Sequence, residues 1–511
     1  MARGSVSLIV LFLFFVFSGL GLSMIYLAQV HLRMNAFRKS SLFLDYASEN
    51  GIKRGLEDLV DALGAGGGAG PLSESTLEEF REDPAAVFPR LLEEGLGAAF
   101  PRDFRESEAG ANWKSVSTCG LRSAEDRGGH FRILAGLALE SSGGLDRLRP
   151  RRRSSLEATL GLLAGRVPLP AIPLLIDKEM SAAERSDFMR SNGISLVAAD
   201  GNLAAPPAPA AAGAVIPKDA TPLLAKALDV RIFKPQDLSP AKLRQALGLE
   251  PSGEPVPEGV YLIRTDLGLG GVYVQGDLDE MVLAIDGDAQ VIAFRLAAGD
   301  WVLRFSPSRS RTEFATPAGV SRYDASPLGI VVVSGRVGAL GGGVVDGDGE
   351  VTLVRDTEVP SVLSGVGLTI VSSGKVTLAS HLILQGVRWQ DGIPYIKEPQ
   401  TQLVIFSTGR DFMTQAEIDS GIGVAAGAPQ ELKLQASLTA AGGPVEIGGS
   451  GKTVELLGAL HAPGYDGHGN TLRIVRDERA AAGGLDGNVP VTAEPRLCLY
   501  ALRVVSWREH E

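Results

Sequence analysis

Uncharged residues run without interruption from position 5 to position 30, and this is the strongest pattern in the chain. The segment has 26 residues, SVSLIVLFLFFVFSGLGLSMIYLAQV. At ~1.5 Å per helical residue it would span ~39 Å, more than the ~30 Å hydrocarbon core of a bilayer. A secretory signal peptide has a shorter apolar core of ~7–15 residues. The pattern therefore predicts a transmembrane helix whose membrane-spanning positions include Ser5, Leu11, Phe15, Leu20, Ile25 and Val30.

The hydrophobic pattern stays helical beyond this run. Leucine and isoleucine recur at helical spacing between Leu42 and Leu63, and the glycine-rich segment 64–70 with Pro71 would end a helix there. We therefore predict one long helix over residues 5–63, apolar in its first half and amphipathic in its second.

The next part, residues 72–203, predicts a mixed and mostly helical region. Ser73 is a plausible N-terminal cap, and short helices are expected over residues 89–96, 156–163 and 180–192. Residues 204–258 are predicted to form an Ala/Pro-rich linker and one short helix, which Ser239 would cap.

From residue 259 to residue 505 short β-branched and aromatic runs alternate with Gly and Asp, which is typical of strands and turns. A strand, a Ser-containing turn with Gly and a basic residue recur at 331–337, 369–376 and 404–411. Such units cannot bury both faces alone, so we expect the copies to stack. The predicted fold class is α+β, with a β-rich body of the β-solenoid or β-helix-like type; a β-sandwich is the alternative.

Composition narrows the functional classes. The formal net charge is −11, and no broad basic stripe is visible, which argues against nucleic acid as a partner. The chain has two cysteines, Cys119 and Cys498, too few for a disulfide framework or a zinc site. In an oxidising compartment they could form one disulfide bond; two free thiols are the alternative.

Three motifs resemble ligand-binding or metal-binding sites, and each lacks part of the required pattern. The segment 448–453 (GGSGKT) ends like a phosphate-binding loop but lacks its first glycine and precedes a strand, so no nucleotide is expected. The segment 346–350 (DGDGE) is typical of a hairpin turn more than of a calcium loop. His461 and His468 flank one loop without a third ligand. We predict no catalytic residue, no metal site and no cofactor.

The N-terminal residues resemble those of a known superfamily. Arg3-Gly4, followed by SLIV at 7–10, is similar to the opening of type IV pilins and pseudopilins. The segment 47–56 (ASENGIKRGL) resembles the second-half signature of the PilX-like minor pilins. The resemblance implies cleavage between Gly4 and Ser5 by a prepilin peptidase. It departs from the family at Ile9, where most pilins carry Glu.

The β-rich half also resembles a bacterial domain family without an assigned activity that is often found behind a PilX-like anchor. Together the resemblances imply a non-enzymatic minor pilin or pilus-assembly protein of the cell surface. Its partners would be the membrane and other pilins or assembly proteins. It would be a single-pass protein of the inner membrane with a periplasmic or extracellular body, and it could enter a pilus. The basic residues Arg33, Arg38 and Lys39 taken alone favour the opposite orientation.

An enzyme or binding module acting on polysaccharide, anchored to the membrane, is the alternative function. It would need acidic and basic groups from successive coils to converge in one groove. The acidic residues available for it are Asp277, Asp279, Glu280 and Asp391.

Overall fold

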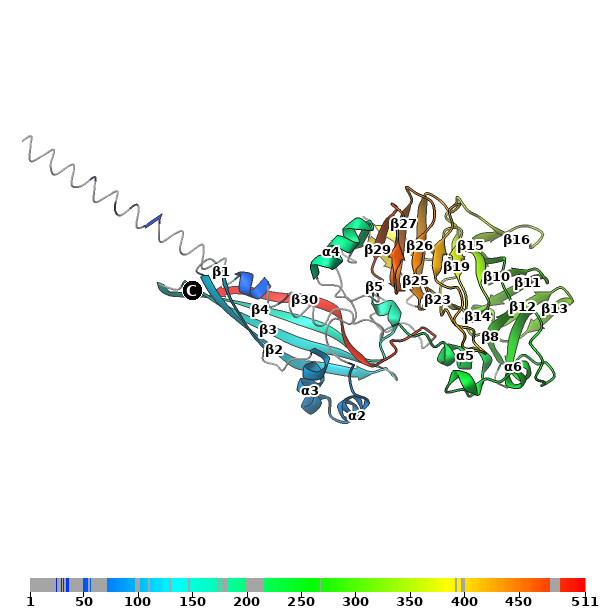
Figure 1. The fold of residues 1–511 in the computed structure, drawn as a ribbon, viewed down its shortest axis with the longest axis horizontal. Helices are drawn as coiled ribbons and strands as arrows, with labels where there is room; N and C mark the ends of the chain where they lie inside the picture. Colours follow the sequence, from blue (N-terminus) through cyan, green and yellow to red (C-terminus); the bar gives the residue numbers. More distant parts are fainter. Residues whose placement is uncertain are drawn as a thin grey trace, which may run out of the picture.

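The structure is a computed structural model of the chain. It describes residues 24, 29, 31, 34, 35, 49–53, 56, 71–96, 102–108, 111–127, 130–145, 148–172, 174–176, 182–197, 216–266, 268–390, 393–396, 400–477 and 488–510. Two bodies follow one another along the long axis of the molecule: a long-stranded sheet, and a body of many short strands (Figure 1).

The fold class differs from the prediction. The chain is mostly β, with 50% of residues in strands and 17% in helices. Among the described residues no helix is long and apolar enough to cross a bilayer. The prediction of an α+β protein led by a long transmembrane helix is therefore wrong.

The first body is a five-stranded antiparallel sheet in the order β1-β2-β3-β4-β30. Its strands are β1 (Arg102–Glu108), β2 (Ala111–Asp126), β3 (His130–Leu145), β4 (Leu148–Gly165) and β30 (Arg496–His510). On β3 the side chains of Phe131, Ile133, Ala135, Leu137 and Leu139 alternate with more exposed ones. This period of two gives the sheet one buried, inner face and one outer face.

The mostly helical region expected over residues 72–203 is a second correction. Residues 156–163, which we expected to be helical, lie within β4. Their leucines and alanines at even positions point to the inner face and the positions between them point outward, so the period is two. The long strands β2 to β4 occupy most of this region.

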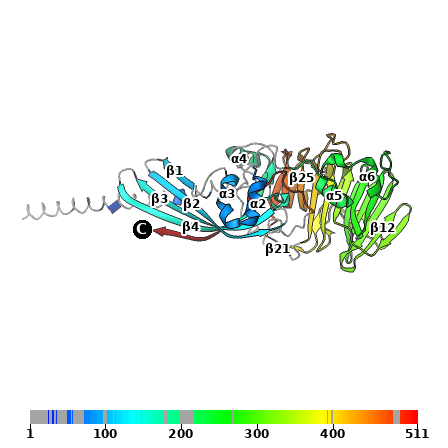
Figure 2. The same ribbon diagram turned by 90° about the horizontal axis from the view of Figure 1, so that it is seen from below.

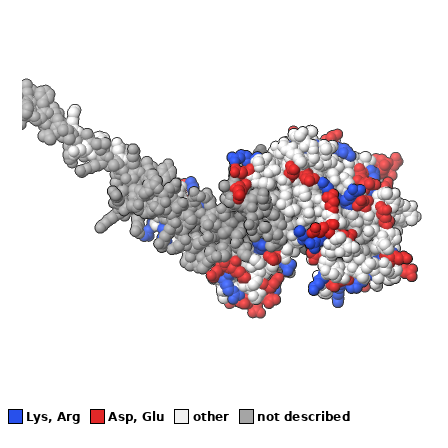
Figure 3. Space-filling view, in the orientation of Figure 1, with Lys and Arg blue, Asp and Glu red and all other residues white. Residues whose placement is uncertain are grey.

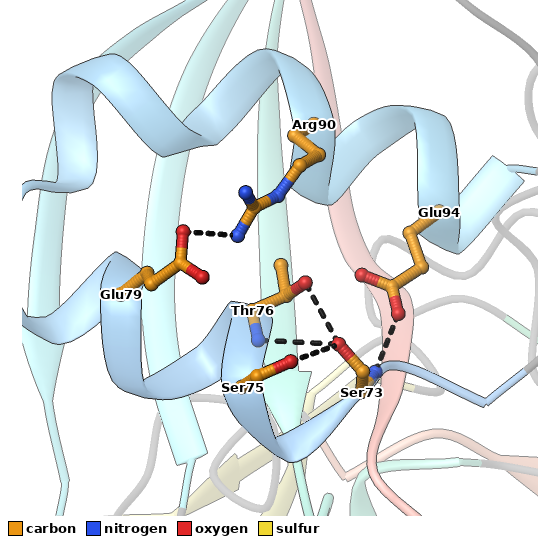
Figure 4. A network of polar contacts seen from close by, with 6 residues as sticks. All are labelled: Ser73, Ser75, Thr76, Glu79, Arg90 and Glu94. Carbon is orange, nitrogen blue, oxygen red and sulfur yellow. Dashed lines mark hydrogen bonds and ion pairs between the residues drawn. The ribbon is translucent and has the colours of Figure 1, made fainter.

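Two short helices cover the inner face at the end nearest the second body, α2 (Glu74–Glu82) and α3 (Pro84–Leu96) (Figure 2). Phe80 of α2 meets Phe131 of the sheet edge to face, with ring centroids 5.0 Å apart. Ser73 caps α2 as expected, because its hydroxyl accepts a hydrogen bond from the Thr76 backbone N–H (Figure 4).

The second body is a solenoid whose coils stack by parallel pairing on three faces. The first face contains β8 (Gly268–Gln275), β14 (Ile330–Ser334), β18 (Gly367–Ser372), β23 (Gln402–Ser407), β25 (Glu431–Ala440) and β27 (Thr453–Ala462). The second contains β9 (Glu280–Asp286), β15 (Val337–Val345), β19 (Val376–Leu378), β24 (Ile422–Val424), β26 (Val445–Ile447) and β28 (Tyr465–Asp466). The third contains β17 (Pro360–Val362), β20 (Ile383–Leu384), the first halves of β25 and β27, and β29 (Thr471–Val475).

Strands from outside the coils extend this solenoid at both ends. At one end β7 (Gly259–Thr265) pairs with β8, and β10 (Ala289–Leu296), β11 (Gly299–Ser306), β12 (Arg311–Thr316) and β13 (Gly319–Tyr323) continue from β9 as an antiparallel meander. At the other end β5 (Leu174–Ile176) and β6 (Ile194–Val197), with α4 (Ala182–Ser191) between them, pair with β27 and β29.

Smaller elements complete the description. The helices α5 (Thr221–Leu228) and α6 (Pro240–Ala246) pack over the outside of the first face, and Ser239 caps α6 as expected. The remaining elements are β16 (Val351–Leu353), the hairpin β21 (Val387–Gln390) and β22 (Ile393–Ile396), and the 3₁₀ helices η1 (Leu169–Ala171), η2 (Pro235–Asp237) and η3 (Pro307–Arg309).

The Ser–Gly repeat lies at one corner of the coils. Its three copies are neighbours, since Val332 is aligned with Val371, and Val371 with Phe406. At the corner Ser372 donates from its hydroxyl to the Gly335 carbonyl, at 2.7 Å, and Ser407 donates to the Gly374 carbonyl of the preceding coil, at 2.9 Å. The repeated serine thus satisfies carbonyl groups that leave the ladder where the chain turns.

The solenoid is inserted between two neighbouring strands of the sheet. The chain leaves the sheet at the end of β4, forms the solenoid and returns as β30, which pairs with β4. The two connections are hydrogen-bonded to each other: Leu169 donates from its backbone to the Pro490 carbonyl, and Thr492 to the Val167 carbonyl, each at 2.9 Å. Residues 497–505, which we expected to end the β-rich body, lie in this returning strand.

A methyl group at Gly329, just before β14, should disrupt the stack of coils. A Cβ there would lie 1.8 Å from the Gly367 carbonyl oxygen of the next coil. We expect Gly329→Ala to lower the free energy of unfolding by about 3 kcal/mol. Gly347→Ala, where a Cβ meets open space, should change it by less than about 0.5 kcal/mol. Denaturant unfolding of both variants tests this, and equal effects would contradict the close approach of the two coils.

Candidate functional site

The described residues of the segment 47–56, which resembles the minor-pilin signature, place apolar side chains on the five-stranded sheet. Ile52, within residues 47–56, is fully buried in the same apolar cluster as the inner-face residues of β3 and β4. Leu56, one helical turn later, packs against this cluster. Lys53 and Glu49 form an exposed ion pair at 3.0 Å. The described residues 49–53 are helical, and they turn an apolar face to the sheet and a charged face away from it.

The outer face of the same sheet carries a polar hollow of about 890 Å³. Cross-strand pairing places its outward positions side by side, Lys114 by Ser142, Ser142 by Arg153, Glu140 by Ser155 and Ser155 by Arg508. Small residues form the floor of the hollow, and long charged side chains from four strands surround it.

The helices α2 and α3 are joined by a network of polar contacts (Figure 4). Glu79 of α2 forms an ion pair with Arg90 of α3. Glu94 accepts a hydrogen bond from the Ser73 backbone N–H at 2.6 Å. Asp83 starts α3, since its carboxylate accepts from the Ala86 N–H at 3.1 Å. These contacts join the two helices, which we call the projection.

His461 is buried and does not share a site with His468. It is fully buried in β27; its Nδ1 lies 3.0 Å from the Thr439 hydroxyl, and its Nε2 lies 2.6 Å from the Ile172 carbonyl oxygen. The contact with a carbonyl places the proton on Nε2, so the hydroxyl donates to Nδ1. Burial lowers the pKa of His461 to about 4, so the ring is neutral and joins β27 to the connection after β4. His468 instead contacts the adjacent Asp466 at the surface.

Two of the four acidic residues available to a polysaccharide enzyme are held in ion pairs. Asp277 forms an ion pair with Arg336 at 2.9 Å and accepts from its backbone N–H. Glu280 forms an ion pair with Arg295. Asp279 donates from its backbone to the Arg295 carbonyl, and Asp391 lies outside the described residues. Among the described residues no three His, Cys, Asp or Glu side chains come together as metal ligands would.

The other two motifs are turns of the solenoid. In segment 346–350 the Asp346 carboxylate accepts the backbone N–H groups of Asp348 and Glu350, both at 2.9 Å, between β15 and β16. In segment 448–453 Lys452 is 1% exposed, and its ammonium donates to the Ala428 carbonyl inside the body. The ammonium group of this lysine is therefore not exposed to bind a phosphate.

The two cysteines do not pair. Cys119 lies on β2 and Cys498 on β30, and neither is in a disulfide bond. Two strands separate them in the sheet, so at ~4.8 Å per strand they are ~14 Å apart, beyond the ~7 Å limit for a disulfide bond. They also belong to different apolar clusters. Burial raises the pKa of the Cys119 thiol to about 12, so this thiol stays protonated.

The remaining predicted site residues lie outside the described part of the chain. These are the processing residues Gly4 and Ser5 and the membrane-spanning positions Leu11, Phe15, Leu20, Ile25 and Val30. Sequence reasoning missed the hollow on the sheet. Its signal is the alternation of small with charged residues at outward positions of β3 and β4, which a helical interpretation of 156–163 conceals.

Comparisons with protein families, with curated proteins and with solved structures found no match to this chain.

The buried ring of His461 should make stability fall in mild acid. The pKa of His461 is about 4 in the folded protein and near 6.5 when unfolded. Between these pH values only the unfolded chain binds the proton, so the free energy of unfolding decreases as the pH falls from 6.5 to 4, by up to about 3 kcal/mol.

Denaturant unfolding of the wild type and of His461→Gln between pH 7 and pH 4 measures this effect. We expect the difference between them to shrink as the pH falls, because the glutamine does not titrate. Thr439→Val removes the neighbouring hydroxyl but keeps the imidazole, so it should retain the pH dependence. A constant difference between wild type and His461→Gln would contradict a buried neutral histidine.

Proposed function

We propose that this chain is a non-enzymatic structural component of a type IV pilus-like assembly. The five-stranded sheet, together with the helical residues around Ile52, would be the base, and the solenoid would be the displayed part. The observation that carries the proposal is the burial of Ile52 on the sheet. The segment that resembles the minor-pilin signature is the one that packs there.

The construction of the solenoid supports a role in display. At one end β7 and the meander of β10 to β13 extend the first and second faces, and at the other end β5 and β6 pair with β27 and β29, so strands from outside the coils cover these ends of the ladders. On the third face Lys433 forms an ion pair with Glu358 at 2.7 Å, and Arg473 with Glu455 at 3.1 Å. These ion pairs place charged side chains along the third face.

The proposed setting follows from the same resemblance. The chain would be exported, processed between Gly4 and Ser5, and held at the cell surface among other pilins or assembly proteins.

The mature N-terminus tests this proposal. Mass spectrometry of the protein from its native host should find a chain that begins at Ser5. A Gly4→Leu variant should keep its first four residues, because the peptidase of this family cuts after a small residue. A wild-type chain that begins at Met1 or Ala2 would refute the pilin-like assignment.

The packing of Ile52 is tested by hydrogen exchange. Ile52→Ala should lower local stability by about 2–4 kcal/mol and speed amide exchange in β3 and β4. Exchange in the solenoid should be unchanged. Asn50→Ala, at an exposed position, should change neither, within about 0.5 kcal/mol. Equal exchange in the two variants would show that this helix does not depend on the sheet.

A further inference from the structure

The two faces of the base carry opposite charge. Residues 71–96, which form α2 and α3, contain seven acidic and two basic residues, a net charge of −5. In Figure 3 the Asp and Glu side chains gather on this lobe. The acidic residues Glu74, Glu78 and Glu82 recur every four residues and share one side of α2.

Part of this negative charge has no counter-charge within the described chain. Glu79 and Glu94 are held in the network that joins the helices, and Glu74 lies 3.5 Å from Arg166. Glu78 and Glu82 are exposed and have no ion pair with any described residue. Like charges one turn apart disfavour the helix unless a positive group lies nearby.

The opposite, outer face of the sheet is basic. Its outward side chains that the structure describes include six basic residues, Lys114, Arg122, Arg132, Arg153, Arg503 and Arg508, against three acidic ones, Glu125, Glu140 and Glu157. The hollow of about 890 Å³ is bordered by Lys114, Glu140 and Glu157, and by the two arginines Arg153 and Arg508. Neither arginine forms an ion pair within the described chain, whereas on the solenoid Arg295, Arg304 and Arg473 each meet a carboxylate.

We propose that the hollow on the outer face receives the α2–α3 projection of a second copy of this chain. The projection is convex and acidic; the hollow is floored by small residues and bordered by arginines that form no ion pair with any described residue. In the complex Glu78 and Glu82 of one copy lie against Arg153 and Arg508 of the other.

The contact uses two different surfaces, so it does not close on itself. Each copy keeps a free hollow at one side and a free projection at the other, and a repeated head-to-tail contact of this kind builds an open filament. The projection packs beside Phe131, which is paired with Ala164 of β4, and the hollow is centred near Ser155 of the same strand. These two positions of β4 are nine residues apart, so at ~3.3 Å per residue neighbouring copies would be staggered by roughly 30 Å.

This inference rests on the proposed structural function, but it can fail separately. A chain processed at Gly4 that does not associate through these faces would refute only the contact. A chain that associates through them but is never processed would refute only the pilin-like function.

Sedimentation velocity of the full chain in a non-ionic detergent tests the contact, because the detergent suppresses association through apolar segments without screening charge. The wild type should associate in about 50 mM NaCl and dissociate in about 500 mM, where the Debye length falls to ~4 Å. The double variants Arg153→Glu with Arg508→Glu, and Glu78→Arg with Glu82→Arg, should each weaken association at low salt by about tenfold or more.

An equimolar mixture of the two double variants should associate again to within about threefold of the wild type, since each then offers the other a complementary surface. The control, Lys218→Glu with Arg231→Glu, reverses two exposed charges on the solenoid body and should associate normally. All variants should keep the melting temperature of the wild type. A wild type that stays monomeric at low salt, or a mixture that does not recover, would overturn the proposal.

Discussion

The antiparallel pairing of β30 with β4 runs from Arg496 opposite Gly165 to His510 opposite Arg153, and it joins the last strand of the chain to one formed before the solenoid begins. Without it the sheet would end at β4, the apolar side of β30 would be exposed, and the solenoid would hang from a single connection. With it, the solenoid is an insertion with two hydrogen-bonded connections. The entropic cost of closing a loop grows only with the logarithm of its length. Closing this long loop therefore costs little more free energy than closing a loop of half its length.

Both faces of the sheet depend on β30. The pairing of β30 completes the outer face of the sheet, since it contributes Arg508 beside Ser155 of β4. It also completes the inner face, where Leu497 joins the cluster that contains Ile52 and Phe80. Strand β30 therefore contributes both to the apolar cluster on which Ile52 packs and to the hollow on the outer face.

Local signals and the stacking of the Ser–Gly copies were predictable from the sequence, and the pairing of the long strands was not. Ser73 and Ser239 cap helices as expected, because capping depends on a few adjacent residues. The Ser–Gly copies around Val332, Val371 and Phe406 lie in neighbouring coils. Residues 156–163 misled us, because leucine, alanine and glycine at close spacing fit a helix as well as a strand with one covered face. Small and charged residues alternate in β3 and β4, but the sequence does not show that they line a hollow, because its side chains come from four strands whose alignment only the sheet provides.

Because β4 and β30 are connected to the solenoid at the same end of the sheet, the molecule can resist tension. Both strands run along the long axis of the molecule, and both reach the solenoid at the same end of the sheet (Figure 1). A pull on the solenoid is therefore divided between two strands and acts along them. Their hydrogen bonds to neighbouring strands are loaded in shear, all at once, whereas a pull across the strands would break them one after another. The molecule is built to bear tension in the direction in which its two bodies are joined.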